Sequence, residues 1–297
     1  MRLLLPISRS ARAENQPAPS VAAMFHALSL YVATGITSFG WALSKLAGWD
    51  ARPWLPLWFC AALLVYNVDR LQKESADSLN VPRRTALSAR LRGLNLTLIA
   101  TASVVLLCLP AVRGDWRTLA LVIAGAIVCL NYSRPLLGFR FKDVPLLKTF
   151  FAPTIVVTAL IGLPLVHEGA PKHGGYFAMV TAHAWALLLF NMALCDLRDL
   201  IGDRRGGIVS LPLALGGKRT RQFLWVLFAA MEALALSALA SAPAELAPTW
   251  AIMSSGVPFY LGSLLLALRS PRSEGFYEWW VEGILFLPAL AVFLGLA

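Results

Sequence analysis

Apolar segments long enough to cross a lipid bilayer recur along this chain. We recognise them at residues 24–48, 54–71, 93–112, 116–132, 146–166, 176–196, 223–241, 249–268 and 279–297. A spanning helix needs about 20 mainly apolar residues. Only 14% of the residues are charged, whereas soluble domains carry about 25%. The sequence therefore predicts an all-α, polytopic membrane helical bundle of about nine transmembrane helices. We expect one domain over residues 21–297, preceded by a flexible tail over residues 1–20.

Positive charges are concentrated on one side of this predicted topology. With an odd number of spans, the amino-terminal tail and the loops after the second, fourth, sixth and eighth spans share a side. That side holds every one of the 26 lysines and arginines except Lys45, Arg52, Arg113, Arg117 and Lys172. Cytoplasmic loops carry such an excess. We expect an inner or plasma membrane protein with a cytoplasmic amino terminus and an outside carboxyl terminus. Membrane orientation also explains the net charge of +10 without nucleic acid as a partner.

Three acidic residues follow the sixth apolar segment at helical spacing. Asp196, Asp199 and Asp203 share one narrow face if the helix continues, because successive residues turn by about 100°. Carboxylates gathered in this way repel one another unless a cation neutralises them. Their hard oxygen ligands suit Mg²⁺. The spacing therefore predicts a magnesium site at this helix end.

A second acidic segment follows the second apolar segment. Asp69, Lys73 and Asp77 are spaced by four residues and would form one stripe on a continuing helix. One interpretation is a solvated row of ion pairs, each contributing a few tenths of a kcal/mol. However, Asn67 and Asp69 lie inside or near the apolar span, where surface ion pairing explains little. The other interpretation makes the two acidic segments two halves of one site.

Cations and a hydroxyl group follow the fourth apolar segment, where Tyr132, Arg140, Lys142 and Lys148 occur within a short polar stretch. The excess of positive charge in cytoplasmic loops is sufficient to explain the presence of any one of these cations. Together, beside acidic residues, they favour an anion such as a diphosphate that Mg²⁺ bridges to the carboxylates, since Arg and Lys donate charge-assisted hydrogen bonds to phosphate oxygens.

The motifs resemble those of the UbiA superfamily of intramembrane prenyltransferases. The run Gly202–Gly217 (GDRRGGIVSLPLALGG) resembles the second motif of its chlorophyll-synthase and menaquinone-type branches. The stretches YSRPLLGFRFK and DSLNVP resemble segments that follow the fourth and second helices of the family. The resemblance implies transfer of an isoprenoid chain from an allylic prenyl diphosphate to a lipophilic, often aromatic acceptor, with Mg²⁺.

The resemblance also implies roles for individual residues. The catalytic candidates are Asp69, Asp77, Asp199 and Asp203, and the same four with Asp196 are the metal-ligand candidates. The candidates for substrate binding are Asn67, Arg70, Lys73, Tyr132, Arg140, Lys142, Lys148, Asp196 and Lys218.

The first motif departs from the family pattern. Lys73 and Arg70 stand where the family has acidic residues, so only Asp69 and Asp77 remain there. Either these cations contact the diphosphate directly, or the chain is a degenerate, non-catalytic isoprenoid-binding protein. A secondary transporter is a further alternative, although transporters typically place polar residues at mid-membrane on broken helices.

Overall fold

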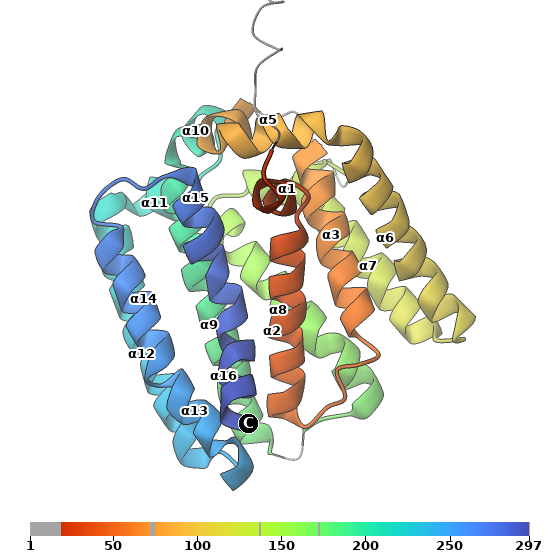
Figure 1. Ribbon diagram of the computed structural model, residues 1–297, viewed down its shortest axis with the longest axis vertical. Coiled ribbons are helices and arrows are strands. Elements are labelled where there is room, and N and C mark those ends of the chain that lie inside the picture. The colour runs from red at the N-terminus through yellow and green to blue at the C-terminus, as the bar shows by residue number, and fades with distance from the viewer. Residues whose placement is uncertain (1–18, 72–74, 137, 172, 297) are drawn as a thin grey trace, which may run out of the picture.

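The computed structural model describes residues 19–71, 75–136, 138–171 and 173–296, with the backbone alone at residues 75–77. Within these ranges every regular element is a helix (Figure 1). The long helices are α2 (Leu30–Ala47), α3 (Leu55–Leu71), α6 (Arg92–Val112), α7 (Trp116–Ser133), α8 (Leu147–Glu168), α9 (Gly174–Arg198), α12 (Gly217–Ser241), α14 (Gly256–Ala267) and α16 (Leu287–Leu296). Shorter helices are α1 (Val21–Ala27), α4 (Ser75–Asn80), α5 (Pro82–Arg90), α10 (Leu200–Gly206), α11 (Leu211–Leu215), α13 (Ala247–Met253) and α15 (Glu274–Phe276).

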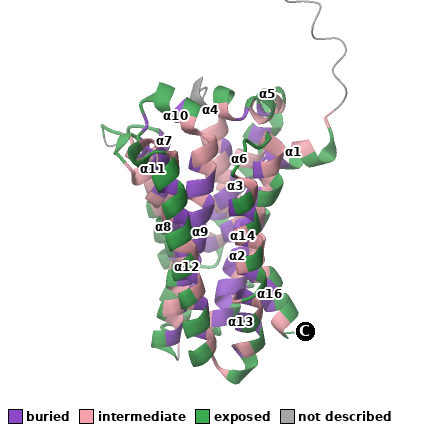
Figure 2. Cartoon of the chain, turned by 90° about the vertical axis from the view of Figure 1, so that its left-hand side faces the viewer, coloured by how far each residue is buried: buried purple, intermediate pink, exposed green. Residues whose placement is uncertain are grey.

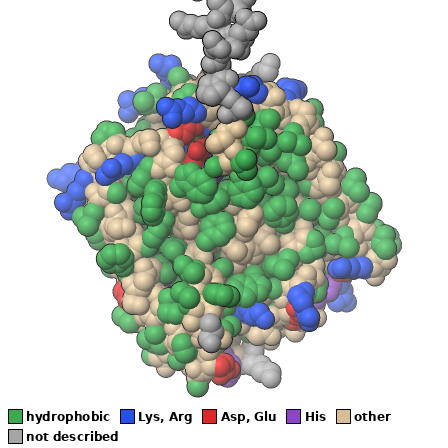
Figure 3. Space-filling model, viewed as in Figure 1, with side chains coloured by type: hydrophobic (Ala, Val, Ile, Leu, Met, Phe, Trp, Pro, Cys, Tyr) green, Lys and Arg blue, Asp and Glu red, His purple; other side chains and the backbone are tan. Residues whose placement is uncertain are grey.

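The predicted membrane bundle is confirmed. Among the described residues, seven helical segments are long and apolar enough to span a bilayer, or eight if the bent pair α1–α2 is one span. The remaining predicted segment, 54–71, is helix α3, whose 17 residues make it slightly shorter than those seven. Hydrophobic side chains cover the middle of the face in Figure 3, while charged groups lie mostly toward its two ends. The chain is an integral membrane protein.

Helix α9 forms the centre of the bundle. It packs against α8, α12 and α2, and 67% of its spanning window is buried, compared with 17% in α7. Leu187, Phe190 and Leu194 are fully enclosed, and Figure 2 shows buried residues running through the middle of the molecule around this helix. Because α9 is held on all sides, the acidic residues at its end have fixed positions.

The first span is broken at the junction of α1 and α2, where the two helices meet at 69°. Ser29 adopts the left-handed conformation there, with φ of 60°. Its hydroxyl donates to Asn67 Oδ1 at 3.0 Å, and Asn67 Nδ2 donates to the carbonyl of Leu28 at 3.2 Å. Backbone groups freed inside a membrane need such partners, so Asn67 stabilises the break.

The last span is irregular along its first half. After α15, a π-helical turn covers Tyr277–Val281 and a 3-10 turn covers Glu282–Phe286 before α16 begins. Three carbonyl groups of the π-turn accept side-chain hydrogen bonds from three different helices: Tyr31 on α2, Tyr260 on α14 and Asn191 on α9 donate to Trp279, Trp280 and Val281, respectively. These bonds hold the irregular backbone in one conformation.

The two acidic segments lie at the same end of the bundle. Helix α4 includes position 77 of the first acidic segment. It packs against α10, which carries Asp203 of the second acidic segment. The backbone N–H of Gly202 donates to Asn80 Oδ1 at 2.9 Å. Figure 1 shows α4's neighbours α5 and α10 together at the top of the molecule. The fold therefore brings together two segments that are about 120 residues apart in the sequence.

Candidate active site

The side chain of Lys148 lies among three carboxylates. Its Nζ atom is 2.7 Å from Asp203 Oδ2, 3.3 Å from Asp196 Oδ1 and 3.7 Å from Asp199 Oδ2. Asp196 is fully buried, and only 2% of Asp203 is exposed. A carboxylate out of water is costly unless it is paired. Lys148 therefore stabilises the acidic residues of the second motif where they converge.

Local backbone structure places Lys148 at this point. Leu146, just before α8, has a left-handed φ of 66°, which costs a non-glycine residue on the order of 1–3 kcal/mol. Its N–H donates to the carbonyl of Val209 at 2.8 Å. Thr149 donates its hydroxyl hydrogen to Asp196 and accepts the N–H of Leu211 at 3.1 Å. The start of α8 is thus held against the segment that follows the acidic residues.

Asp199 has a different partner from its two neighbours. Arg198 donates to both of its oxygens, at 2.7 and 3.1 Å. Burial alone would raise the pKa of Asp199, but Arg198 and Lys148 outweigh it and hold the pKa below its ordinary value. For Asp203, burial is the larger effect and raises the pKa, although Lys148 opposes it. Asp199 is thus the more strongly ionised of the two.

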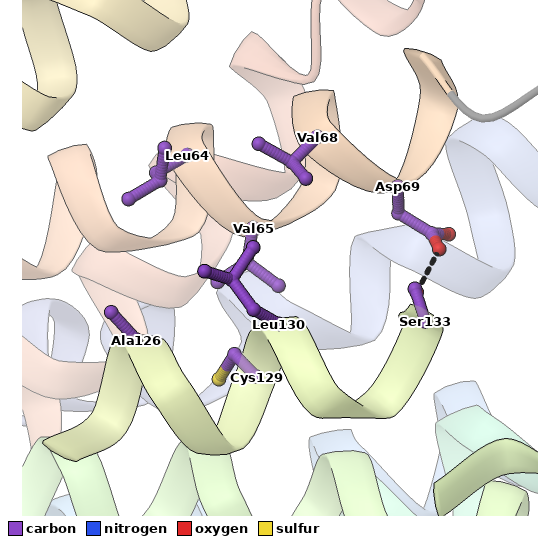
Figure 4. A pocket seen from close by; sticks show the side chains of 8 residues that line it. All are labelled: Leu64, Val65, Val68, Asp69, Ala126, Cys129, Leu130 and Ser133. Carbon is purple, nitrogen blue, oxygen red and sulfur yellow. Dashed lines mark hydrogen bonds between the residues drawn. The ribbon is translucent and has the colours of Figure 1, made fainter. Parts of the chain in front are cut away.

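Asp69 of the first acidic segment faces the same region. Ser133 at the end of α7 donates its hydroxyl hydrogen to Asp69 Oδ1 (Figure 4). The neighbouring Tyr132 interacts electrostatically with Lys148, Asp69, Asp196 and Asp203. Its ring stacks on Phe151, with 4.9 Å between the centroids. The structure therefore brings the described part of the first segment close to the second.

A cleft between α3 and α7 begins at Asp69. Its lining is apolar apart from Asp69 and Ser133 at one end, as Figure 4 shows, and its cavity volume is about 30 Å³. The other lining residues are Leu64, Val65, Val68, Ala126, Cys129 and Leu130. A polar end and an apolar lining match a ligand with a charged group and a hydrocarbon tail.

The donor chemistry of the site fits Mg²⁺, which prefers oxygen ligands. The Oδ1 atom of Asp196 is buried and accepts no hydrogen bond among the described residues, and its ion-pair partner Lys148 lies 3.3 Å away. Lys148 and Arg198 are the described cations in ion-pair contact with Asp196, Asp199 and Asp203. Even so, no three acidic, histidine or cysteine side chains in the described part of the chain are arranged to hold a metal ion on their own.

The remaining predicted site residues have varied positions. Arg70 donates to the carbonyl of His26, and Arg140 pairs with Asp143 at 2.7 Å. Lys142 is buried and Lys218 is exposed at the start of α12. Lys73 and the side chain of Asp77 lie outside the described residues.

Sequence reasoning missed three charged residues near the site. Arg198 lies between Asp196 and Asp199 in the sequence. Its place beside two predicted site residues at the end of an apolar segment was the signal that could have identified it. Arg84 pairs with Glu282 at 3.1 Å. An acid such as Glu282 inside an apolar span was also a signal, because charges there are costly and often functional.

Taken together, the fold and the site define a membrane-embedded helical bundle with a charged site at one end. The model of the UbiA prenyltransferase family matches residues 66–281. The lycopene elongase/hydratase of Haloferax volcanii is 30% identical over 224 residues, covering 71% of this chain and 70% of that protein. Naringenin 8-dimethylallyltransferase 2 of Sophora flavescens is 26% identical over 58% of this chain and 44% of its own length.

A solved structure has the same fold. It is a UbiA homolog from Archaeoglobus fulgidus bound to GPP and Mg²⁺, with a TM-score of 0.60 and 16% identity, covering 92% of this chain and 96% of that one. The chain belongs to the UbiA prenyltransferase family and is a prenyltransferase, as its motifs predicted. Membership of a prenyltransferase family argues against the alternative, raised from the sequence, that the chain is a secondary transporter.

Proposed function

We propose that this enzyme binds an allylic prenyl diphosphate with Mg²⁺ at the end of the bundle that carries Asp69, Asp196, Asp199 and Asp203. The main observation in support is the position of Lys148, whose ammonium group lies within 3.7 Å of three carboxylates. A relative solved with GPP and Mg²⁺ has the same fold.

The balance of charge supports a divalent cation. Asp69, Asp196, Asp199 and Asp203 carry four negative charges when ionised, and Lys148 and Arg198 are the described cations in ion-pair contact with them. Two negative charges then remain, and a prenyl diphosphate would add more, so the proposed complex needs cationic charge beyond that of Lys148 and Arg198. When bound, Mg²⁺ supplies electrostatic stabilisation of the charge that develops on the departing diphosphate.

Lys148 has a second role in this proposal. A lysine is a compact, mobile point charge with three donors, so its ammonium group can turn from the carboxylates toward a diphosphate oxygen. Tyr132 interacts electrostatically with the same groups, and its hydroxyl is a candidate for orienting the ligand. Lys73 and Asp77 remain candidates from the sequence for contacts to the diphosphate and the metal, respectively.

The apolar cleft between α3 and α7 is a candidate path for the prenyl tail. Its cavity volume of about 30 Å³ is close to that needed by a water molecule, so the lining side chains must move apart to admit a hydrocarbon chain. Its polar end is formed by Asp69 and Ser133, and the rest of its lining is hydrocarbon and a cysteine. This lining would exclude water from an allylic cation, which water would otherwise capture. The acceptor must then be lipophilic, because it has to approach within the membrane.

The proposed orientation puts this site at the cytoplasmic face. The polar segments with the acidic residues lie at the end of the bundle where the sequence places most cations. Water-soluble prenyl diphosphates would then reach the site from the cytoplasm, and the carboxyl terminus would lie outside.

A non-catalytic isoprenoid-binding protein is the alternative that the altered first motif favours. The test is to incubate the purified protein with farnesyl or geranylgeranyl diphosphate, Mg²⁺ and a mixed pool of lipophilic aromatic acceptors, and to measure release of diphosphate. Release that requires Mg²⁺ supports the enzyme. Binding of the prenyl diphosphate with no release would favour the degenerate protein.

A further inference from the structure

A small cavity lies among α9, α12, α13 and α14, away from the acidic motifs. Its volume is about 10 Å³, which is close to the space that one water molecule needs. His183 and Asp196 both belong to α9, and at a rise of about 1.5 Å per residue they are about 20 Å apart along it. The cavity is therefore separate from the charged site. The residues that line it are His183, Phe228, Met231, Glu232, Met253, Val257, Pro258 and Leu261.

The polar side chains in this lining are His183 and Glu232. Both lie inside long apolar helices, α9 and α12. His183 is only 3% exposed, and Glu232 Oε2 is buried with no hydrogen-bond partner among the described residues. No charged group in the described part of the chain acts on either side chain. Ionisable groups at this depth in a membrane are costly and mark functional sites by default.

The ring of His183 is held in position from behind. It packs edge-to-face against Trp250, with 5.5 Å between the ring centroids. Trp250 is itself fully buried, and its Nε1 donates to the hydroxyl of Tyr176 at 2.7 Å. The imidazole therefore has a fixed orientation at the inner end of the cavity, which lowers the entropic cost of binding a ligand there.

The cavity opens toward the lipid. Glu232, Phe228 and Pro258 are half-buried, whereas Met231 and Met253 are buried. Helices α12 and α14, which carry the half-buried residues, pack against one another. The cavity thus leads inward from the outer surface of the bundle, between these helices, to His183. A molecule that enters it comes from the bilayer and must be lipophilic.

Hydrogen-bonding capacity defines the group that fits. An unpaired acid in hydrocarbon is far more stable in its neutral form. A neutral carboxyl group and a neutral imidazole each donate one hydrogen bond and accept at least one. A hydroxyl group can satisfy both, because it donates to one and accepts from the other. Its oxygen also needs little more room than that of a water molecule.

We propose that His183 and Glu232 form a membrane-facing binding site for the hydroxyl group of a lipophilic alcohol or phenol. The hydrocarbon part of this ligand lies along the outer surface of α12 and α14. This site is distinct from the one in the proposed function. A single bridging water is the other occupant that the volume allows, and it would give the site no selectivity for a lipid.

The test is photo-crosslinking of the full-length protein in lipid nanodiscs with a long-chain alkylphenol that carries a diazirine, compared with its methyl ether. The ether has the same hydrocarbon part but cannot donate a hydrogen bond. Labelling is measured by mass spectrometry on the peptide that contains α13 and α14, which carries none of the substitutions. We expect the phenol to label this peptide of the wild-type protein at least fivefold more than the ether does.

Glu232→Leu and His183→Leu should each reduce this preference to less than twofold. Glu232→Gln should keep a preference of at least threefold, because a side-chain amide also donates and accepts. This rescue is a result that a merely structural role of the charge would not produce. The matched control is Ser237→Ala on the same helix, whose hydroxyl already donates to the carbonyl of Ala233 at 2.7 Å. It should stay within twofold of wild type.

Equal labelling of the wild-type protein by the phenol and the ether would overturn the site and leave a bridging water. A preference that survives in Glu232→Leu would also overturn it, and this half-buried position keeps the test decisive if His183→Leu does not fold. An excess of unlabelled alkylphenol or of unlabelled prenyl alcohol identifies the ligand class. Competition by either supports the site, whereas competition by neither would contradict specific binding.

Discussion

The Nζ atom of Lys148 lies 2.7 Å from each carboxylate oxygen of Asp203, although the two residues are separated by 55 positions in the chain. The contact joins the start of α8 to α10, and Asp196 and Asp199 lie around the same ammonium group. One lysine thus holds together the acidic residues that we propose as the metal site. Its removal should therefore affect stability and metal binding in opposite directions.

Lys148→Met should lower the stability of the fold and increase its response to Mg²⁺. Removing one partner of a buried ion pair costs about 3–5 kcal/mol, because the other charge is left unpaired. Added Mg²⁺ should replace the missing charge and restore part of the loss. The measurement is the thermal unfolding midpoint in detergent with and without Mg²⁺, and Lys218→Met, at an exposed position, is the control. Equal Mg²⁺ shifts in both variants and wild type would argue against a metal at these carboxylates.

Asp203→Asn should abolish Mg²⁺-dependent release of diphosphate with little loss of folded protein. The change removes a metal ligand and one partner of Lys148, but it also relieves repulsion among the carboxylates. Lys148 keeps Asp196 and Asp199 as partners, so the folded state loses less than the reaction does. Size-exclusion elution and diphosphate release are the two readouts. Asp143→Asn, which removes an acid paired with Arg140 outside this cluster, should retain activity. An active Asp203→Asn enzyme would remove this residue from the site.

Cysteines introduced at Ser78 and Val209 should not react with an impermeant reagent added outside intact cells. Both positions lie at the end of the bundle that the distribution of cations places in the cytoplasm. The experiment needs a background in which Cys60, Cys108, Cys129 and Cys195 are replaced. A cysteine at Glu245, in the turn before α13 at the other end, should react. The reverse pattern would invert the topology.

Lys73→Ala should weaken the binding of prenyl diphosphate by about tenfold to a hundredfold. A charge-assisted hydrogen bond in a partly desolvated site contributes roughly 1.5–3 kcal/mol. Lys73→Asp should recover some binding only at raised Mg²⁺, because a new carboxylate needs a second metal. Dissociation constants across an Mg²⁺ titration provide the comparison. A change of less than about threefold in Lys73→Ala would assign the lysine to a solvated row of ion pairs.

The helices were predictable from the sequence because lipid requires long apolar segments, and each predicted segment corresponds to a helix or to a broken span. The spacing of Asp196, Asp199 and Asp203 predicted one helical face, but helix α9 ends at Arg198 and α10 begins at Leu200. The three carboxylates converge around Lys148 of α8, a contact that the spacing did not predict. The break between α1 and α2 was not predictable, because it depends on hydrogen bonds from Asn67 to the Leu28 carbonyl and from the Ser29 hydroxyl to Asn67, which join groups distant in the sequence. The same holds for the π-turn and for Glu282, since the hydrogen bonds to the turn come from three separate helices.

The most direct test of the account is a comparison of diphosphate release by the wild-type protein and Asp203→Asn, reconstituted in lipid nanodiscs with geranylgeranyl diphosphate and a lipophilic aromatic acceptor pool. We expect release by the wild-type protein that requires Mg²⁺ and stops when a chelator is added. Asp203→Asn should show no release above background. Release that proceeds equally in the variant, or that ignores the chelator, would contradict a metal-assisted reaction at these carboxylates.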